Sequence, residues 1–397
     1  MSDKEYAALE IGTTRTILAI AEEVNGRLKV THVPEIISSG IHKSQIHDIN
    51  QATQSVKSVL NEINKIEEQN NINLNIANAY LVTSDCDIKA DTYESNTMVN
   101  GTVTDDNIAD VQDLSDNANL PNDREILEIT PQYYELDNLS NISAPKGMSG
   151  RLLRFHTLHI HASKDRINDA RKAAENALIE IVEPLFAASC AARAVTDESE
   201  KKNGILVLDL GGGTTGYALY SDGYLLDAGV IGVGGDHITN DIAHAFQTNN
   251  SQAEKIKCSE ASAVISSDTS RVKIPNSGII ADNRTISRHS LDTVVNARVK
   301  ELLAIIRETL EEKGSWHLIH RGIVITGGGA SLKGIHELIE QEYGLQVRTG
   351  KPIYVDGLES LPHPEAYASV AGALMYAHEN DTDRGSFLGD LIGRFFK

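Results

Sequence analysis

The same short pattern occurs twice in the chain, about half its length apart, and this repeat limits the possible folds more than any other feature. An apolar strand over residues 6–11 carries Glu10 near its end, and a second apolar strand over residues 205–210 carries Asp209 in the same place. Each strand runs into a turn rich in glycine and threonine, then into a further strand. Such an internal duplication predicts two similar α/β lobes that face each other across a cleft.

Each unit also continues in the same way. Strands are expected over 16–21 and 27–33 in the first unit, and over 216–220 and 224–230 in the second. The tight turns between them are Asn25-Gly26 and Asp222-Gly223. These dipeptides favour two-residue hairpins because both positions accept positive φ.

The turns have the composition of a phosphate cradle. Backbone N–H groups reach a phosphate most closely where no Cβ intervenes, and threonine hydroxyls add donors. The residues expected to supply this surface are Gly12, Thr13, Thr14, Gly211, Gly212, Gly213, Thr214 and Thr215. A lone glycine run is more often a flexible turn. Here each run follows an apolar strand and has a counterpart in the other half of the chain, which favours a nucleotide clamp.

Charged residues flank both turns. Glu10 and Asp209 stand at strand ends, where carboxylates can hold the water shell of a Mg²⁺ ion. Arg15 can offset phosphate charge. A third glycine run, Gly327, Gly328 and Gly329, follows another predicted strand that begins at residue 322.

Helical spacing of apolar residues predicts helices over 50–64, 163–181 and 287–313. Residues 83–162 are richer in Asp, Asn, Ser and Thr and end in a strand over 152–161, which indicates an inserted mixed α/β subdomain. The expected organisation is a lobe 1 core (1–83 and 163–204), an inserted subdomain (84–162), a lobe 2 core (205–235 and 315–376), a second lobe 2 subdomain (236–314), a linker (377–386) and a terminal helix (387–397).

These motifs resemble the actin-like superfamily of ATPases, which includes sugar kinases and chaperones, and within it the FtsA family of bacterial cell-division proteins. The resemblance covers essentially the whole chain. Residues 323–330 resemble the adenosine motif, and residues 145–152 resemble the end of the FtsA-type insertion. By the same resemblance, further nucleotide-binding positions are Gly234, Gly235, Asp236, Glu254 and Lys257. Residues 182–189 resemble the inter-lobe helix, so Glu183 becomes a candidate for positioning an attacking water.

The resemblance implies a cytoskeletal adaptor that binds ATP with Mg²⁺ and forms actin-like filaments. It further implies contacts with later division proteins and with the C-terminal peptide of the tubulin-like protein FtsZ, which would dock on residues 236–314. Glu10 replaces the Asp of many superfamily members, and Arg15 replaces Lys. Arg has a different hydrogen-bonding geometry from Lys, so we expect ATP binding with at most weak ATPase activity.

Other readings stay open at this stage. A pilus-assembly ATPase of the PilM type would share the insertion but lack the terminal membrane helix. A sugar kinase would need a base beside a sugar pocket, and a DnaK-type chaperone would need a peptide-binding domain after the ATPase.

The C-terminal segment is amphipathic. On a helix, six apolar side chains fall within about half the circumference: Phe387, Leu388, Leu391, Ile392, Phe395 and Phe396. Glycines and charged residues fill the other half. Such a face suits the boundary between lipid headgroups and acyl chains, and about 16 Å of helix is too short to cross a bilayer. The alternative is a terminal helix docked on the protein's own body. Together with the resemblance to FtsA-like proteins, which end in such a membrane-targeting helix, this implies a peripheral protein on the cytoplasmic side of the membrane, at the division septum.

Net charge narrows the choice of partners. The chain carries a formal charge of −20, so a polyphosphate such as nucleic acid would be repelled. An anionic membrane surface would repel the chain as well, so any membrane contact must be local and largely apolar.

The three cysteines are scattered, which argues against a disulfide framework and a zinc site. The charged start of the chain leaves no room for a signal peptide, so a cytosolic protein is expected.

Overall fold

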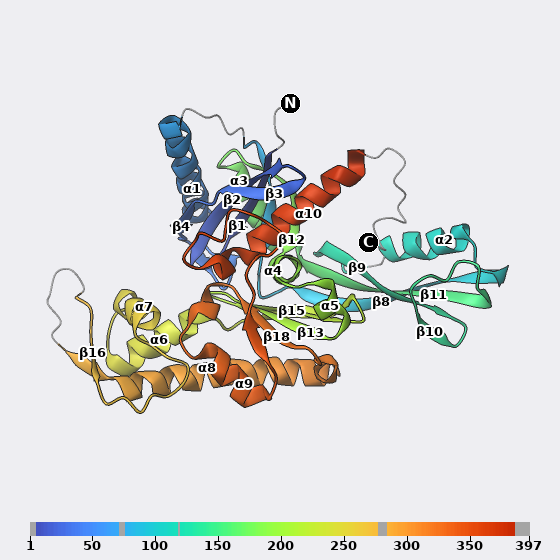
Figure 1. Cartoon of the computed structure of the whole chain (residues 1–397). Coiled ribbons are helices and arrows are strands. Elements are labelled where there is room, and N and C mark those ends of the chain that lie inside the picture. The colour runs from blue at the N-terminus through green and yellow to red at the C-terminus, as the bar shows by residue number, and fades with distance from the viewer. Residues whose placement is uncertain (1–4, 71–75, 118–119, 277–283, 386–397) are drawn as a thin grey trace.

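The computed structural model describes residues 5–70, 76–117, 120–276 and 284–385. Two lobes, each built on its own sheet, lie against one another, and a third sheet extends away from them (Figure 1). No helix in these ranges has the length and apolar character needed to span a membrane.

The sheet of lobe 1 has the strand order β12-β7-β1-β2-β3, with β4 paired to β2. Its strands are β1 (Glu5–Ile11), β2 (Arg15–Val24), β3 (Arg27–His32), β4 (Glu35–Ile37), β7 (Asn78–Thr83) and β12 (Glu180–Phe186). The strands β1, β2 and β3 are antiparallel, whereas β7 and β12 run parallel to β1. A small hairpin, β5 (Ile41–His42) and β6 (Gln45–Ile46), precedes the helix α1.

Side chains of β1 alternate between two cores, as strand geometry requires. Ala7 and Leu9 pack with α1 (Ile49–Asn70) and α3 (Lys164–Glu175). Tyr6 and Ala8 point to the other face and pack with α4 (Ala187–Val195) and α10 (Ala368–Gly385). Lobe 1 is therefore a three-layer sandwich.

Lobe 2 repeats this topology, with the order β15-β14-β13-β18-β19. Its strands are β13 (Ile205–Leu210), β14 (Thr215–Ser221), β15 (Tyr224–Ile231), β18 (Gly322–Thr326) and β19 (Val347–Thr349). Again three antiparallel strands precede two parallel ones. The duplication predicted from the two motifs is confirmed at the level of sheet topology.

The other elements of lobe 2 are mainly helical. They are α5 (Glu198–Lys202), α6 (Gly235–Phe246), α7 (Asn250–Ser259), β16 (Arg271–Lys273), β17 (Thr285–Ser287), α8 (Arg288–Glu312), α9 (Ile335–Tyr343) and three 3-10 turns (Trp316–Leu318, Gly328–Ser331 and Pro364–Tyr367). Apolar residues of α6, α7, α8 and α9 share one core with one face of the lobe 2 sheet.

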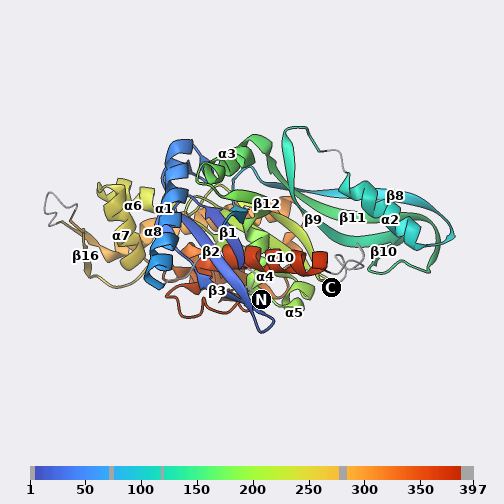
Figure 2. The same cartoon turned by 90° about the horizontal axis from the view of Figure 1, so that it is seen from above.

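The inserted subdomain is a sheet of order β10-β9-β11-β8. Its elements are β8 (Lys89–Thr102), α2 (Asp105–Asp116), β9 (Arg124–Leu136), β10 (Leu139–Ile142) and β11 (Ser149–Ser163). It has a core of its own in which Tyr134 stacks on Phe155. Seen from above, this sheet projects from the side of the molecule opposite α6 and α7 (Figure 2).

The predicted helix over 163–181 is too long. α3 ends at Glu175, and the chain then turns through Leu178, which has φ 67°. The Leu178 N–H donates to the Glu175 carbonyl, and the Ile179 N–H donates to the Ala174 carbonyl. This is a Schellman cap with leucine in the position that glycine usually takes, so the sequence carries no stop signal there. Residues 182–186, read as part of the inter-lobe helix, lie in strand β12, and the helix α4 begins at Ala187.

The expected linker over 377–386 also differs, because α10 continues as a helix to Gly385. α10 packs on α4 and on the lobe 1 sheet, although residues 368–376 follow the lobe 2 motif in sequence. Glu379 pairs with Arg193 at 2.5 Å, and the Tyr6 hydroxyl donates to Asp381 at 3.2 Å. These contacts fix the polar stretch to lobe 1. The predicted membrane helix over 387–397 lies outside the described residues.

Candidate nucleotide-binding site

The two glycine turns have the same backbone geometry. The Gly12 N–H donates to the Arg15 carbonyl at 3.0 Å, and the Gly211 N–H donates to the Thr214 carbonyl at 3.0 Å. A Cβ at Gly12 would lie 2.9 Å from its closing carbonyl, and a Cβ at Gly211 would lie 2.8 Å from its own. Glycine opens both turns because a side chain would collide with the backbone that closes them.

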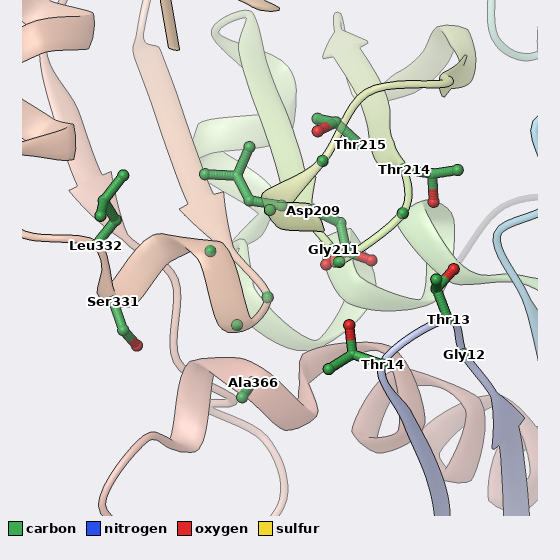
Figure 3. Close-up of a pocket in the computed structure, with 18 of the residues that line it drawn as sticks. Gly12, Thr13, Thr14, Asp209, Gly211, Thr214, Thr215, Ser331, Leu332 and Ala366 are labelled. Carbon is green, nitrogen blue, oxygen red and sulfur yellow. The ribbon is translucent and has the colours of Figure 1, made fainter. Parts of the chain in front are cut away.

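The turns meet across the cleft between the lobes. A Cβ at Gly212 would lie 1.9 Å from the Thr14 hydroxyl, and one at Gly213 would lie 2.4 Å from the Thr13 hydroxyl. Figure 3 shows Thr13 and Thr14 facing the loop that carries Gly211 and Thr214. The cleft that they line has a volume of about 520 Å³. Small side chains and backbone N–H groups of glycine-rich turns therefore come from both lobes, as a clamp on phosphates requires.

Glu10 and Asp209 line this cleft from the two lobes. Burial and the nearby Glu10 raise the pKa of Asp209 to about 7. Burial also raises the pKa of Glu10, although Ser369 and Arg15 act in the opposite direction. Two carboxylates held close in a poorly solvated cleft repel one another unless a cation lies between them. This donor set fits a hydrated Mg²⁺.

This repulsion leads to a stability prediction for Asp209→Asn in the absence of metal. The pKa of Asp209 is higher in the folded chain than its ordinary value of 3.8, so ionisation opposes folding. The variant should gain stability over the parent as pH rises from about 4 to 7, and the gain should stay constant above that. We expect about 2 kcal/mol at pH 8, because Asp209 is only partly buried and solvent screens its charge. Urea unfolding in EDTA at pH 5 and pH 8 measures it, and a pH-independent difference would contradict it.

The third glycine run lies at the end of β18. Gly327 has φ 78°, and its Cβ would lie 2.4 Å from an oxygen of Asp209. The Gly327 N–H donates to the Glu365 carbonyl at 3.0 Å, which ties the run to the turn before α10. All three glycines line the cleft, together with Ser331, Leu332 and Ala366 (Figure 3). The predicted motif thus joins the two phosphate loops in one cavity.

The segment after β15 supports the lobe 2 loop from behind. The Gly235 N–H donates to the Gly211 carbonyl at 3.0 Å, and the Asp236 N–H donates to the Gly212 carbonyl at 2.8 Å. Gly234 and Gly235 line the cleft. Asp236 acts on the loop through its backbone and does not line the cleft among the described residues.

Glu254 and Lys257 are neighbours on α7 and line the same cleft. Their side chains form an ion pair of 2.6 Å, and the Lys257 ammonium also donates to Thr239 at 2.9 Å. Burial acts to raise the pKa of Glu254, but Lys257 and hydrogen bonds outweigh it, so the net shift is downward. Both charges are therefore set in place at the side of the cleft opposite lobe 1.

Of the two remaining candidates, Arg15 lies at the cleft and Glu183 does not. Arg15 lines the cleft, but its guanidinium pairs with Glu35 at 2.6 Å and lies 5.6 Å from the centre of the Tyr367 ring. Glu183 accepts a hydrogen bond from the Tyr376 hydroxyl at 3.2 Å and is not among the cleft residues. Because its carboxylate faces α10, Glu183 is not placed to position a water molecule in the cleft.

Several cleft residues were missed by sequence reasoning: Ser44, Ser84, Arg298, Ser331, Lys333, His363 and Ser369. Ser44 and Ser84 share a hydrogen bond of 2.9 Å, and the Ser44 N–H donates to Thr13 at 2.7 Å. Ser331 and Lys333 directly follow the third glycine run, which could have pointed to them, whereas the other five come from segments without such a run. The fold alone brings them to the cleft.

Comparison with family models gives two matches. Residues 206–372 match the model described as cell division protein FtsA, and residues 89–161 match the model described as the SHS2 domain inserted in FtsA. The second match coincides with the inserted sheet. A cell division protein FtsA from Pseudomonas aeruginosa is 29% identical over 388 residues, covering 96% of this chain and 91% of that protein. The FtsA of Escherichia coli K12 is 27% identical over 389 residues, covering 95% and 91%.

Solved structures with similar folds include a PilM-PilN type IV pilus biogenesis complex, with a TM-score of 0.64 and 15% identity over 94% of this chain and 98% of that chain. MreB5 of Spiroplasma citri bound to ADP has a TM-score of 0.57 and 14% identity over 96% and 99%. The same protein bound to AMPPNP scores 0.54. At such identities the likeness establishes the fold, which is that of the actin-like ATPases.

Proposed function

Because this chain belongs to the FtsA family of cell-division proteins, we propose that it is an ATP-binding adaptor that polymerises on the cytoplasmic membrane and holds FtsZ filaments there. The observation that carries this proposal is that two features occur together in one chain. The actin-like cleft is combined with an inserted sheet over 89–161 that matches the FtsA insertion. The named relatives align along nearly their whole length as well.

The nucleotide is proposed to be ATP with Mg²⁺. MreB5, which shares the fold, has been solved with ADP and with AMPPNP. In this chain Glu10 and Asp209 would hold water molecules of the metal, and the two threonine-glycine loops would bind the phosphates. We propose that the nucleotide acts as an assembly switch with at most slow turnover. In support, the carboxylate of Glu183 faces α10 and leaves that candidate outside the cleft.

Membrane attachment is proposed to rest on residues 387–397. Six large apolar side chains could contribute on the order of 10 kcal/mol to the free energy of membrane binding if fully buried. Partial burial and the cost of helix formation offset much of this contribution. One tail should therefore bind reversibly, whereas a filament that presents many tails should bind firmly. Polymerisation and membrane attachment would then reinforce one another.

The protein partners follow from the family. We propose that the FtsZ C-terminal peptide docks on the subdomain of residues 236–314, which holds α6, α7 and α8. The inserted subdomain, residues 84–162, would contact neighbouring subunits and later division proteins. Its projection away from the two lobes leaves it accessible to such contacts (Figure 2).

Vesicle co-sedimentation with ATP tests the proposal. The full chain is compared with a chain that ends at Gly385, where α10 ends, each with and without FtsZ. We expect only the full chain to pellet with lipid and to carry FtsZ down. Ending the chain at the helix end leaves the contacts of α10 with lobe 1 intact, so a loss of lipid binding can be assigned to the removed residues.

Equal pelleting of the two chains would contradict membrane attachment through the tail. The PilM-type reading would then gain ground, since that reading lacks a terminal membrane helix and PilM shares the fold at a TM-score of 0.64. At 15% identity that likeness speaks for the fold alone, so the FtsA-type function is the better supported of the two.

A further inference from the structure

The hydroxyl of Ser369 contacts one of the two carboxylates proposed to hold the metal. It donates to Oε2 of Glu10 at 2.6 Å, and both residues line the cleft. The two residues are 359 positions apart in the chain. No motif in the sequence marks Ser369, so this contact arises from the fold.

Ser369 occupies a rigid position. It lies in the first turn of α10 and is 5% exposed. The turn just before it is fixed to β18, because the Thr326 hydroxyl and the Gly327 N–H both donate to the Glu365 carbonyl. Behind it, Gly372 lies directly against the backbone of Cys190 in α4. The serine hydroxyl is therefore presented to Glu10 by elements that packing holds in place.

Glu10 needs such a support more than an aspartate would. Glutamate has one more rotatable bond than aspartate, so its carboxylate has more orientations to lose when it binds a hydrated ion. Here Oε2 is tied to Ser369, while Oε1 lies 3.5 Å from the point where a Cβ on Gly12 would stand. The free oxygen is thus directed to the first phosphate loop. Asp209, the shorter partner, has no such side-chain hydrogen bond among the described residues.

We infer that Ser369 is a positioning residue, which holds one oxygen of Glu10 so that the other is aimed at the water shell of the nucleotide-bound Mg²⁺. The inference rests on the proposed Mg²⁺–ATP binding and adds to it a residue that acts through Glu10. It explains how a chain with Glu at this position keeps a fixed carboxylate in the cleft. Ser369 itself touches neither nucleotide nor metal in this arrangement.

The test is a magnesium titration of nucleotide binding, followed with a fluorescent ATP analogue, on the full-length chain. Ser369→Ala should raise the Mg²⁺ concentration for half-maximal binding about tenfold, the size expected for losing a hydrogen bond to a charged group. Its affinity for the analogue in EDTA should equal that of the parent. Ser369→Thr keeps the hydroxyl and should restore the parent's magnesium dependence. Urea unfolding of each variant verifies that it is folded.

A double-mutant cycle sharpens the result. In Glu10→Asp the shorter carboxylate is withdrawn from Ser369, so adding Ser369→Ala should change the magnesium dependence by less than twofold. Equal magnesium dependence of Ser369→Ala and the parent would overturn the inference. So would a loss of affinity that is the same in EDTA and in Mg²⁺, because that pattern indicates a structural role. If the parent itself binds no ATP analogue, the proposed function fails, and the inference fails with it.

Discussion

Replacing Gly234 with alanine is expected to lower the affinity for ATP by about ten- to a hundredfold. The new Cβ would lie 2.5 Å from the Gly212 carbonyl oxygen, 2.7 Å from the Gly211 carbonyl oxygen and 2.8 Å from the Thr214 nitrogen. These atoms belong to the lobe 2 phosphate loop and cannot rotate away as a side chain could. Overpacking of this kind costs about 1–3 kcal/mol, and here the strain displaces the loop that binds the phosphates, so it weakens ATP binding.

Gly232→Ala provides a matched control two residues away. Its Cβ would meet the Lys43 ammonium at 3.8 Å and the Cys86 Cβ at 3.9 Å, which are ordinary contacts. We expect its affinity, measured by isothermal titration with Mg²⁺–ATP, to stay within about twofold of the parent. If the two variants bound ATP equally well, the loop would not depend on close packing at Gly234, and the geometric argument for a rigid phosphate cradle would be wrong.

Gly372→Ala is expected to destabilise the folded chain by about 2 kcal/mol or more. Helix propensity alone predicts the opposite, since alanine is better than glycine inside a helix by about 1 kcal/mol. The contact with α4 determines the sign of the stability change, because a Cβ at this position would lie 1.7 Å from the Cys190 carbonyl oxygen and 2.4 Å from the carbonyl carbon. Both atoms are backbone of α4, so α10 must move away as a whole.

The measurement is the urea-unfolding midpoint, followed by far-ultraviolet circular dichroism. A lower midpoint for Gly372→Ala confirms that α10 rests on the backbone of α4. A higher midpoint would mean that propensity dominates and that the two helices separate easily. Cys190→Ala should not rescue the variant, because the obstructing atoms are main-chain atoms that every residue carries.

The sequence predicted those parts of the fold that leave a local mark. Each phosphate loop needs glycine at its first position and follows an apolar strand, so both loops, and the duplicated lobes around them, were recognisable. The C-terminal cap of α3 was not recognisable, because the residue in the left-handed conformation is Leu178 and not the usual glycine or asparagine. The end of a helix can be set by packing as well as by composition.

The serines of the cleft show a second limit of prediction from sequence. Ser369 reaches Glu10 because α10 crosses back onto lobe 1, and that docking depends on contacts between residues hundreds of positions apart. The polar residues 377–385 suggested a coil, but Glu379 and Asp381 pair with lobe 1 and keep the helix in place. Pairings of this kind cannot be read from composition within a short window.

The docking of α10 has a mechanical consequence. The helix is fixed to lobe 1 along its length, from Ser369 on Glu10 to Glu379 on Arg193, and Figure 1 shows it running across that lobe. A force applied at Gly385 therefore acts first on lobe 1, and lobe 2 is joined to it through α4, which packs on the lobe 2 sheet as well. If residues 386–397 hold the chain to a membrane, lobe 1 becomes the stationary half of a hinge. Opening or closing the cleft around a nucleotide then swings lobe 2, and whatever is attached to it, relative to the surface.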